Sequence, residues 1–242
     1  MPVWDELFRQ QVAEVQAADQ QGTVDIIFYG DSIIEAWRGT EMGHFCPRCR
    51  GSDAVFQQYF ASKYKALVMA ISGDQTGHLL WRMMNGHLPV VHQPKVAVIL
   101  IGTNDLGIAF YSDGEQAMMD TAKTITNRIM EMIQYISEHA PTTKVLLVGL
   151  LPRCDRDAFA WPHPLMKGLQ AVNKQLARFE TELWMLGNTI TYAECGPPFI
   201  RGQVLDKDLL PDGLHPNAAG MALVAQCISQ AIEPLLTEQS EA

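Results

Sequence analysis

The chain has 242 residues, of which 48% are hydrophobic and 19% are charged, and its net charge is −9. This length is typical of one domain, and a domain of this size buries enough surface to fold without a disulfide or metal staple. The 27 acidic residues outnumber the 18 basic ones, which argues against nucleic-acid binding because that function requires clustered positive charge. We therefore expect residues 1–242 to form one acidic domain.

The sequence predicts neither a membrane span nor a secretion signal. No run of about 18 apolar residues is present. The first residues, MPVWDELFRQQ, lack the apolar core of a signal peptide. We expect a soluble, cytoplasmic protein, and secretion stays open only for a chain whose signal peptide has already been removed.

The cysteines are too few and too scattered to indicate a disulfide framework. There are five of them, an odd number, and only Cys46 and Cys49 form a CxxC pair, whereas Cys154, Cys195 and Cys227 stand alone. No second CxxC supplies the other half of a structural zinc site. We therefore expect no metal site and interpret the cysteines as incidental thiols.

Short apolar runs alternate with longer segments of helical periodicity. In chain order, the sequence predicts a helix over 2–19, a strand over Val24–Tyr29, a helix over 53–63, a strand over Ala66–Ile71, a helix over 76–85, a strand over Val96–Ile101, a helix over 115–139, a strand over Val145–Leu151, a helix over 164–186, a strand over Thr189–Tyr192 and a helix over 218–235. Most of the strands are continuously apolar and rich in β-branched residues, which is typical of parallel strands buried on both faces.

This alternation predicts an α/β fold. We expect a single flavodoxin-like, three-layer domain in which a five-stranded parallel sheet of order 2-1-3-4-5 carries helices on both faces. Ligands in such sheets bind at the carboxyl ends of the strands. The residues that follow each strand are therefore the place to look for a site.

Four small polar segments lie at that edge of the predicted sheet. Gly30-Asp31-Ser32 follows the first strand, Ser72-Gly73-Asp74 the second and Gly102-Thr103-Asn104-Asp105 the third, and Asp212-Gly213-Leu214-His215 precedes the last helix. Each segment alone is explained by a turn or a helix N-cap. Their occurrence together at one edge indicates a site.

The four segments supply the parts of an acyl-transfer site. A serine hydroxyl needs a base to take its proton, and the base needs a carboxylate to orient it. Ser32 is the candidate nucleophile, His215 the base, and Asp212, three residues before His215 in a tight turn, the orienting acid. The backbone N–H groups of Ser32 and Gly73 and the side-chain amide of Asn104 are candidate oxyanion donors.

Motifs for other chemistries are absent. The sequence has no GxGxxG after the first strand, no GxxxxGK[ST] and no HExxH. The serine lies in GDSII rather than GxSxG, so the strained nucleophile elbow of the α/β-hydrolases is not present.

These residues resemble the GDSL/SGNH hydrolase family. GDSI, ISGDQTG, GTND and DGLHP match its four blocks in the family's order, across nearly the whole chain. Within the family, YGDSIIEAW, ISGDQTGHLLWRMMNGHLP and PKVAVILIGTND are most similar to the catalytic subunits of intracellular platelet-activating-factor acetylhydrolase. The resemblance implies a flavodoxin-like fold and ester hydrolysis without metal or other cofactor, often of short acyl groups, and it suggests a homodimer.

Carried over position by position, the resemblance gives each residue the role derived above. Ser32 is the nucleophile, His215 the base and Asp212 its orienting acid, and Gly73 and Asn104 complete the oxyanion hole with Ser32.

The chain departs from the family pattern in two places. Ile33 stands where the family name has Leu, and its side chain is expected to pack beneath the loop. The CPRC-containing loop over Arg38–Asp53 is not a feature that we associate with the acetylhydrolase subunits, and it bears on substrate access. Candidate substrate contacts are Asp31, Asp74 and Trp161, the last in the loop over 152–164.

We therefore predict a serine esterase that hydrolyses small, acetyl-like esters of a lipid or acetylated sugar through an acyl-enzyme. Two alternatives keep the same fold. One is a non-catalytic module that binds an acyl ester or carbohydrate, and the other is an acyltransferase that uses the same triad. All five catalytic and oxyanion positions are filled, which favours an enzyme over a binding module.

Overall fold

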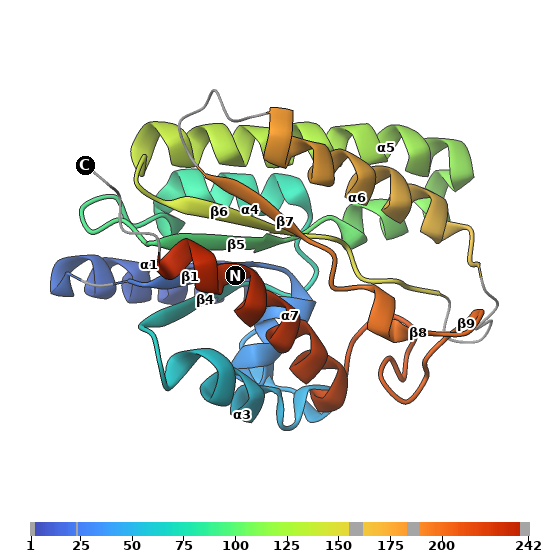
Figure 1. The fold of residues 1–242 in the computed structure, drawn as a ribbon, viewed down its shortest axis with the longest axis horizontal. Helices are drawn as coiled ribbons and strands as arrows, with labels where there is room; N and C mark the ends of the chain where they lie inside the picture. The colour runs from blue at the N-terminus through green and yellow to red at the C-terminus, as the bar shows by residue number, and fades with distance from the viewer. Residues whose placement is uncertain (1–2, 23, 155–161, 183–188, 238–242) are drawn as a thin grey trace.

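The centre of the molecule is a five-stranded parallel sheet of order β4-β1-β5-β6-β7, as seen in a computed structural model (Figure 1). The structure describes residues 3–22, 24–154, 162–182 and 189–237. The strands are β1 (Ile26–Gly30), β4 (Ala66–Ala70), β5 (Val96–Leu100), β6 (Lys144–Val148) and β7 (Ile190–Ala193). Numbered along the chain, this order is the predicted 2-1-3-4-5, so the α/β prediction is confirmed.

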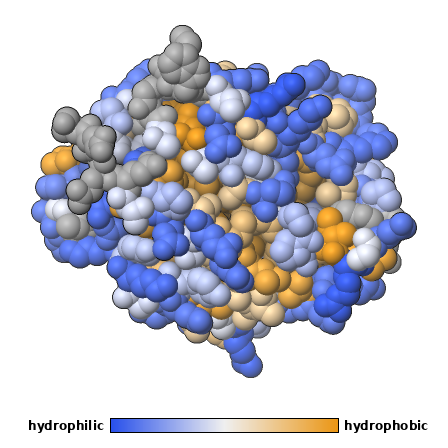
Figure 2. All heavy atoms as spheres, in the orientation of Figure 1, coloured by the Kyte–Doolittle hydropathy of each residue, from blue (hydrophilic) through white to orange (hydrophobic). Residues whose placement is uncertain are grey.

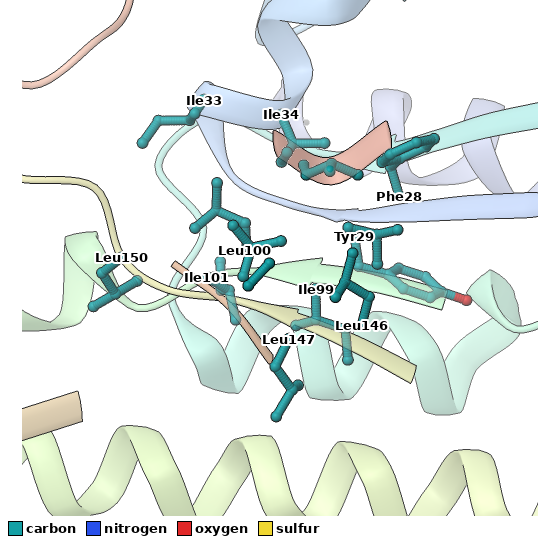
Figure 3. Packing of buried hydrophobic residues seen from close by; sticks show 14 of the residues in the cluster. Phe28, Tyr29, Ile33, Ile34, Ile99, Leu100, Ile101, Leu146, Leu147 and Leu150 are labelled. Atoms are coloured by element: carbon teal, nitrogen blue, oxygen red, sulfur yellow. The ribbon is translucent and has the colours of Figure 1, made fainter. Parts of the chain in front are cut away.

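The central strands are apolar because both of their faces are covered. Every residue of β1 and β5 is buried, and Ile26 of β1 pairs in parallel with Ala66 on one side and Val96 on the other. Side chains alternate between the two faces of the sheet, and Figure 3 shows the neighbouring Phe28 and Tyr29 pointing to opposite faces. A strand that is covered on both sides needs the unbroken run IIFY rather than an alternating pattern.

Helices cover both faces of the sheet (Figure 1). The helices are α1 (Val3–Gln21), α2 (Ser32–Glu35), α3 (Ser52–Phe56), α4 (Thr76–Arg82), α5 (Thr103–His139), α6 (Leu165–Glu182) and α7 (Ala218–Thr237). Helices α4, α5 and α6 pack side by side over one face, and α3 and α7 pack together over the other. Helix α1 lies beside the β4 edge and packs against the short turn η4 (Met83–His87).

Helix α5 begins at Thr103, and the prediction of a helix start at residue 115 is wrong. The apolar periodicity that marked this helix starts with Met118, after Gly114. Gly114 interrupts the helix with φ 84° and ψ −169°. The segment before it carries the GTND block and exposed Ile108 and Tyr111, so it has no apolar stripe from which a helix is recognised.

Helix α7 is long and apolar enough, by length and composition, to cross a membrane. A buried core helix passes the same test. In the structure α7 packs against β5, β6 and β7 and buries Met221, Val224 and Ile228.

The face in Figure 2 is mostly hydrophilic, with hydrophobic atoms exposed in patches between the polar side chains.

Two disulfides are present, and the interpretation of these cysteines as incidental thiols is wrong for Cys46–Cys49 and Cys195–Cys227. Cys154 is free and buried. Cys195 follows β7, and Cys227 lies on α7, which packs against that strand, so tertiary packing rather than sequence spacing brings this pair together. Within the described ranges, no group of three or more His, Cys, Asp or Glu side chains could hold a metal ion.

Two loops contain short hairpins that the sequence did not indicate. In the loop over Arg38–Asp53, β2 (Thr40–Glu41) pairs with β3 (His44–Phe45), and the turn Pro47–Cys49 follows. In the loop before α7, β8 (Ile200–Arg201) pairs with β9 (Val204–Leu205).

Candidate active site

Ser32, His215 and Asp212 form one hydrogen-bonded chain. The Ser32 Oγ lies 2.9 Å from His215 Nε2, and His215 Nδ1 lies 2.8 Å from Asp212 Oδ2. Ser32 begins α2 just after β1, whereas His215, which is 183 positions along the chain, and Asp212 come from the loop before α7. The sheet brings these segments together at its carboxyl edge.

The backbone around Ser32 is held by its two predecessors. Gly30 ends β1 so close to β5 that a Cβ atom there would lie 2.7 Å from the Leu100 carbonyl oxygen and 2.5 Å from Ile34, which excludes any side chain. Asp31 is the N-cap of α2, and its Oδ1 accepts a hydrogen bond from the Ile33 N–H at 3.0 Å. Ser32, the predicted nucleophile, is therefore fixed on the first turn of a helix, where backbone N–H groups have no partner within the helix.

Asp212 is held in place by the turn that it begins. Its Oδ1 accepts from the backbone N–H groups of Leu214 at 3.0 Å and His215 at 2.7 Å, while Oδ2 faces the imidazole. Burial alone would raise the pKa of Asp212, but the hydrogen bonds from the ring and backbone of His215 outweigh it and hold that pKa well below its ordinary value. The carboxylate is therefore charged at neutral pH and can stabilise an imidazolium.

The three predicted oxyanion donors come from segments that the structure links by hydrogen bonds. Gly73 adopts φ +84°, a conformation that L side chains rarely adopt, and no atom lies within 4 Å of the position of a Cβ atom there. Its N–H has no partner among the residues that the structure describes. Asn104 Nδ2 donates to the Asp74 carbonyl oxygen at 2.9 Å, which leaves the amide its second proton.

Asp31 and Asp74, the predicted substrate contacts, are both buried in the structure. Each residue is 1% exposed, and both side chains are taken up by protein contacts. That they contact substrate stays a prediction, and in the structure both side chains support the loops that carry Ser32 and Gly73. Trp161 lies outside the described residues.

A small cavity opens beside Gly73. Its volume is about 340 Å³, and it is lined by Trp4, Asp5, Ser72, Gly73, Asp74 and His78. A larger one, of about 740 Å³, lies between α6 and the residues after β6 and β7 and contains none of the triad or oxyanion residues. The smaller cavity reaches Gly73, a predicted oxyanion donor, whereas neither Ser32 nor His215 lines it.

Comparison with known families gives a match that spans most of the chain. Residues 28–223 match the GDSL-like Lipase/Acylhydrolase family. The chain belongs to this family. It is also similar to platelet-activating factor acetylhydrolase IB subunit alpha2 of Gallus gallus, with 29% identity over 90% of this chain and 80% of that one. Subunit alpha1 of Bos taurus is 27% identical over 97% of this chain and 84% of that one.

Solved structures of the family share the fold. A GDSL-like lipase from Bacteroides thetaiotaomicron superposes with a TM-score of 0.63 at 21% identity and covers 94% of this chain and 97% of its own. An acetylxylan esterase from Geobacillus stearothermophilus gives 0.61 at 15% identity and covers 88% and 95%. With the family match, these findings make this GDSL acylhydrolase a carboxylic ester hydrolase.

Two buried arginines lie near the site, and one of them, Arg82, escaped the sequence analysis. Arg82 is fully buried and holds Asp74, with Nη2 2.6 Å and Nε 2.7 Å from Asp74 Oδ2. Arg153 donates to the Thr103 carbonyl oxygen at 2.9 Å. Burial of the Arg153 guanidinium lowers its pKa. A signal for Arg82 does exist, because it is the one charged residue in the otherwise apolar run LLWRMM.

Two buried carboxylates were missed as well. Asp105 accepts from Thr76 N at 2.9 Å and Thr76 Oγ1 at 2.7 Å, which ties the GTND block to the start of α4. Glu35 is fully buried and accepts from both the N–H and the hydroxyl of Ser72. Glu35 also interrupts an apolar run, IIEAW, and such an isolated charge indicates a buried, partnered side chain.

Proposed function

We propose that this GDSL acylhydrolase is a serine esterase that cleaves small acyl esters through an acyl-enzyme, with Ser32 as nucleophile, His215 as base and Asp212 as orienting acid. The observation that carries the proposal is the continuous hydrogen-bonded chain from Ser32 Oγ through the His215 ring to Asp212. The same residues come from both ends of the chain, which supports one domain over residues 1–242.

Acylation begins with attack of Ser32 Oγ on the ester carbonyl carbon as the hydroxyl proton passes to His215 Nε2. The carbonyl oxygen becomes an oxyanion, and the N–H groups of Ser32 and Gly73 and the free amide proton of Asn104 are its donors. When the tetrahedral intermediate collapses, the bond to the alcohol oxygen breaks, and His215 returns the proton to that oxygen. The alcohol leaves, and the acyl group remains on Ser32.

Deacylation repeats the sequence with water. His215 takes one proton from a water molecule, whose oxygen attacks the acyl carbon and forms a second oxyanion. Collapse breaks the bond to Ser32 Oγ, which regains a proton from His215, and the carboxylic acid leaves. Asp212 remains a carboxylate throughout and stabilises the transient imidazolium.

The names of two relatives support a small acyl group. The relatives named acetylhydrolase and acetylxylan esterase carry acetyl in their names. We propose an acetyl-sized acyl group and leave the alcohol portion of the ester open.

The decisive experiment is hydrolysis of p-nitrophenyl acetate by Ser32→Ala, with Ser62→Ala, at an exposed serine, as matched control. We expect Ser32→Ala to lose activity and labelling by a fluorophosphonate while its circular dichroism stays unchanged, and Ser62→Ala to behave as wild type. Turnover near the wild-type value in Ser32→Ala would refute the assignment.

A further inference from the structure

Glu35 lies one turn of helix after the nucleophile and contacts the segment that carries Gly73. The side chain is fully buried. Its Oε2 accepts from Ser72 N at 2.7 Å and Ser72 Oγ at 2.6 Å. These are short, charge-assisted hydrogen bonds, and they fix Ser72, the residue directly before the proposed oxyanion donor Gly73.

The same carboxylate also holds the hairpin of the loop over Arg38–Asp53. Oε1 accepts from Thr40 Oγ1 at 2.9 Å and Gly43 N at 2.8 Å, and Oε2 accepts from Met42 N at 3.1 Å. All five partners of Glu35 are donors, so the geometry requires a side chain that only accepts. A glutamine would present an NH₂ group to at least one of these donors and lose contacts that a carboxylate keeps.

Gly73 depends on its neighbours for its orientation. Its φ of +84° is a conformation that L side chains rarely adopt, and no atom lies within 4 Å of the Cβ position. Its N–H makes no hydrogen bond within the described chain. The direction of this N–H is therefore set by how firmly Ser72 and Asp74 are held, and Glu35 holds the Ser72 side.

We propose that Glu35 is a positioning residue for ester hydrolysis, which fixes the Ser72–Gly73 peptide so that the Gly73 N–H points at the developing oxyanion. The inference rests on the proposed function, because it assigns the oxyanion hole to Gly73. A donor that must reorganise during the reaction stabilises the transition state less than one already in place. Glu35 touches neither substrate nor the triad and acts through Ser72.

The test compares Glu35→Gln and Ser72→Ala with Thr40→Val, which removes a hydrogen bond only from the hairpin side of the same carboxylate. Competent sites are counted by fluorophosphonate labelling to completion, and kcat is expressed per labelled site with p-nitrophenyl acetate. Small displacements of reacting groups cost up to about 100-fold in rate. We expect kcat per site to fall about 10- to 100-fold in Glu35→Gln and less, but at least about threefold, in Ser72→Ala.

If Glu35 had a purely structural role, its substitution would change other measured quantities than kcat per site. It would reduce the number of labelled sites and leave kcat per site unchanged. In a positioning role, KM stays within about twofold while kcat falls. Affinity for phenylboronic acid, which forms a tetrahedral anion on the serine, weakens in parallel with kcat. Thr40→Val should keep kcat per site within about twofold of wild type.

Two outcomes overturn the inference. One is a kcat per site within twofold of wild type in both Glu35→Gln and Ser72→Ala, and Ser72→Ala alone decides if Glu35→Gln does not fold. The other is an equal loss in Thr40→Val, because the effect is then not specific to the Ser72 side. Wild-type turnover in Ser32→Ala instead refutes the proposed function itself, so the two failures are distinguishable.

Discussion

Replacement of Arg82 by methionine should destabilise the protein more than any surface substitution. The guanidinium is fully buried and meets the Asp74 carboxylate at 2.6 Å. It also donates to the carbonyl oxygens of Met69 at 3.1 Å and Gly30 at 3.2 Å, at the ends of two neighbouring strands. Methionine fills much of the same volume but donates no hydrogen bond.

The magnitude follows from what the substitution leaves behind. Removal of one partner from a buried ion pair costs about 3–5 kcal/mol because the other charge remains buried without compensation. Asp74 is 1% exposed, and among the described residues only the Trp4 Nε1 donor, at 2.7 Å, then remains hydrogen-bonded to its carboxylate. We expect a loss of about 3–5 kcal/mol, a large part of the 5–15 kcal/mol that is usual for a folded domain.

The assay is urea unfolding followed by far-ultraviolet circular dichroism, with the midpoint compared at constant slope. Arg9→Met, at an exposed arginine of α1, is the control and should change stability by no more than about 0.5 kcal/mol. The double variant Arg82→Met/Asp74→Asn should recover part of the loss, because no lone charge stays buried. A loss below about 1 kcal/mol in Arg82→Met, or no recovery in the double variant, would refute the reasoning.

Three further predictions concern the triad, the N-cap of α2 and a disulfide. Asp212→Asn should lower kcat for p-nitrophenyl acetate by about 10³–10⁴-fold, because the amide no longer fixes the productive imidazole tautomer. Burial raises the pKa of Asp31 from 3.8 to about 7, so the folded chain keeps a proton that the unfolded chain has lost between these values. The contribution of Asp31 to the free energy of unfolding is fully present below pH 4 and is lost as the pH rises through about 7. Asp31→Asn should therefore make the free energy of unfolding, measured by urea from pH 4 to 8, fall less with pH. An unchanged slope would contradict the Asp31 shift. Replacement of both Cys195 and Cys227 by serine opens a loop of 32 positions and should lower the unfolding free energy by about 3–4 kcal/mol under non-reducing conditions; equal stability with and without the bond would contradict a structural role.

The fold and the main site residues could be predicted because they follow from local patterns joined by one topological rule. Runs such as IIFY and VAVIL are apolar throughout, which marks buried parallel strands. Once five such strands are placed, their carboxyl ends must meet at one edge. Ser32 and His215 then lie at the same edge although they are 183 positions apart.

What the sequence did not reveal depends on side chains that meet only in three dimensions. Glu35 and Arg82 have helical or apolar surroundings in the sequence, and their partners lie on other elements. The pairing of Cys195 with Cys227 depends on α7 packing against β7. The start of α5 at Thr103 was hidden because its first turns carry site residues in place of an apolar stripe.

Two of the buried charges that were missed, Glu35 and Arg82, bear on the same three residues. Glu35 holds Ser72, and Arg82 holds the side chain of Asp74, while the Asp74 carbonyl oxygen accepts from Asn104. Gly73 lies between them, and its N–H has no partner within the described chain. An oxyanion donor has to remain unpaired in the free enzyme and yet be fixed in direction, since reorganisation during the reaction would reduce its effect. Because the Gly73 N–H makes no hydrogen bond that could hold it rigid, the neighbouring residues must fix its direction. Glu35 does so through Ser72 on one side, and Arg82, of opposite charge, does so through Asp74 on the other.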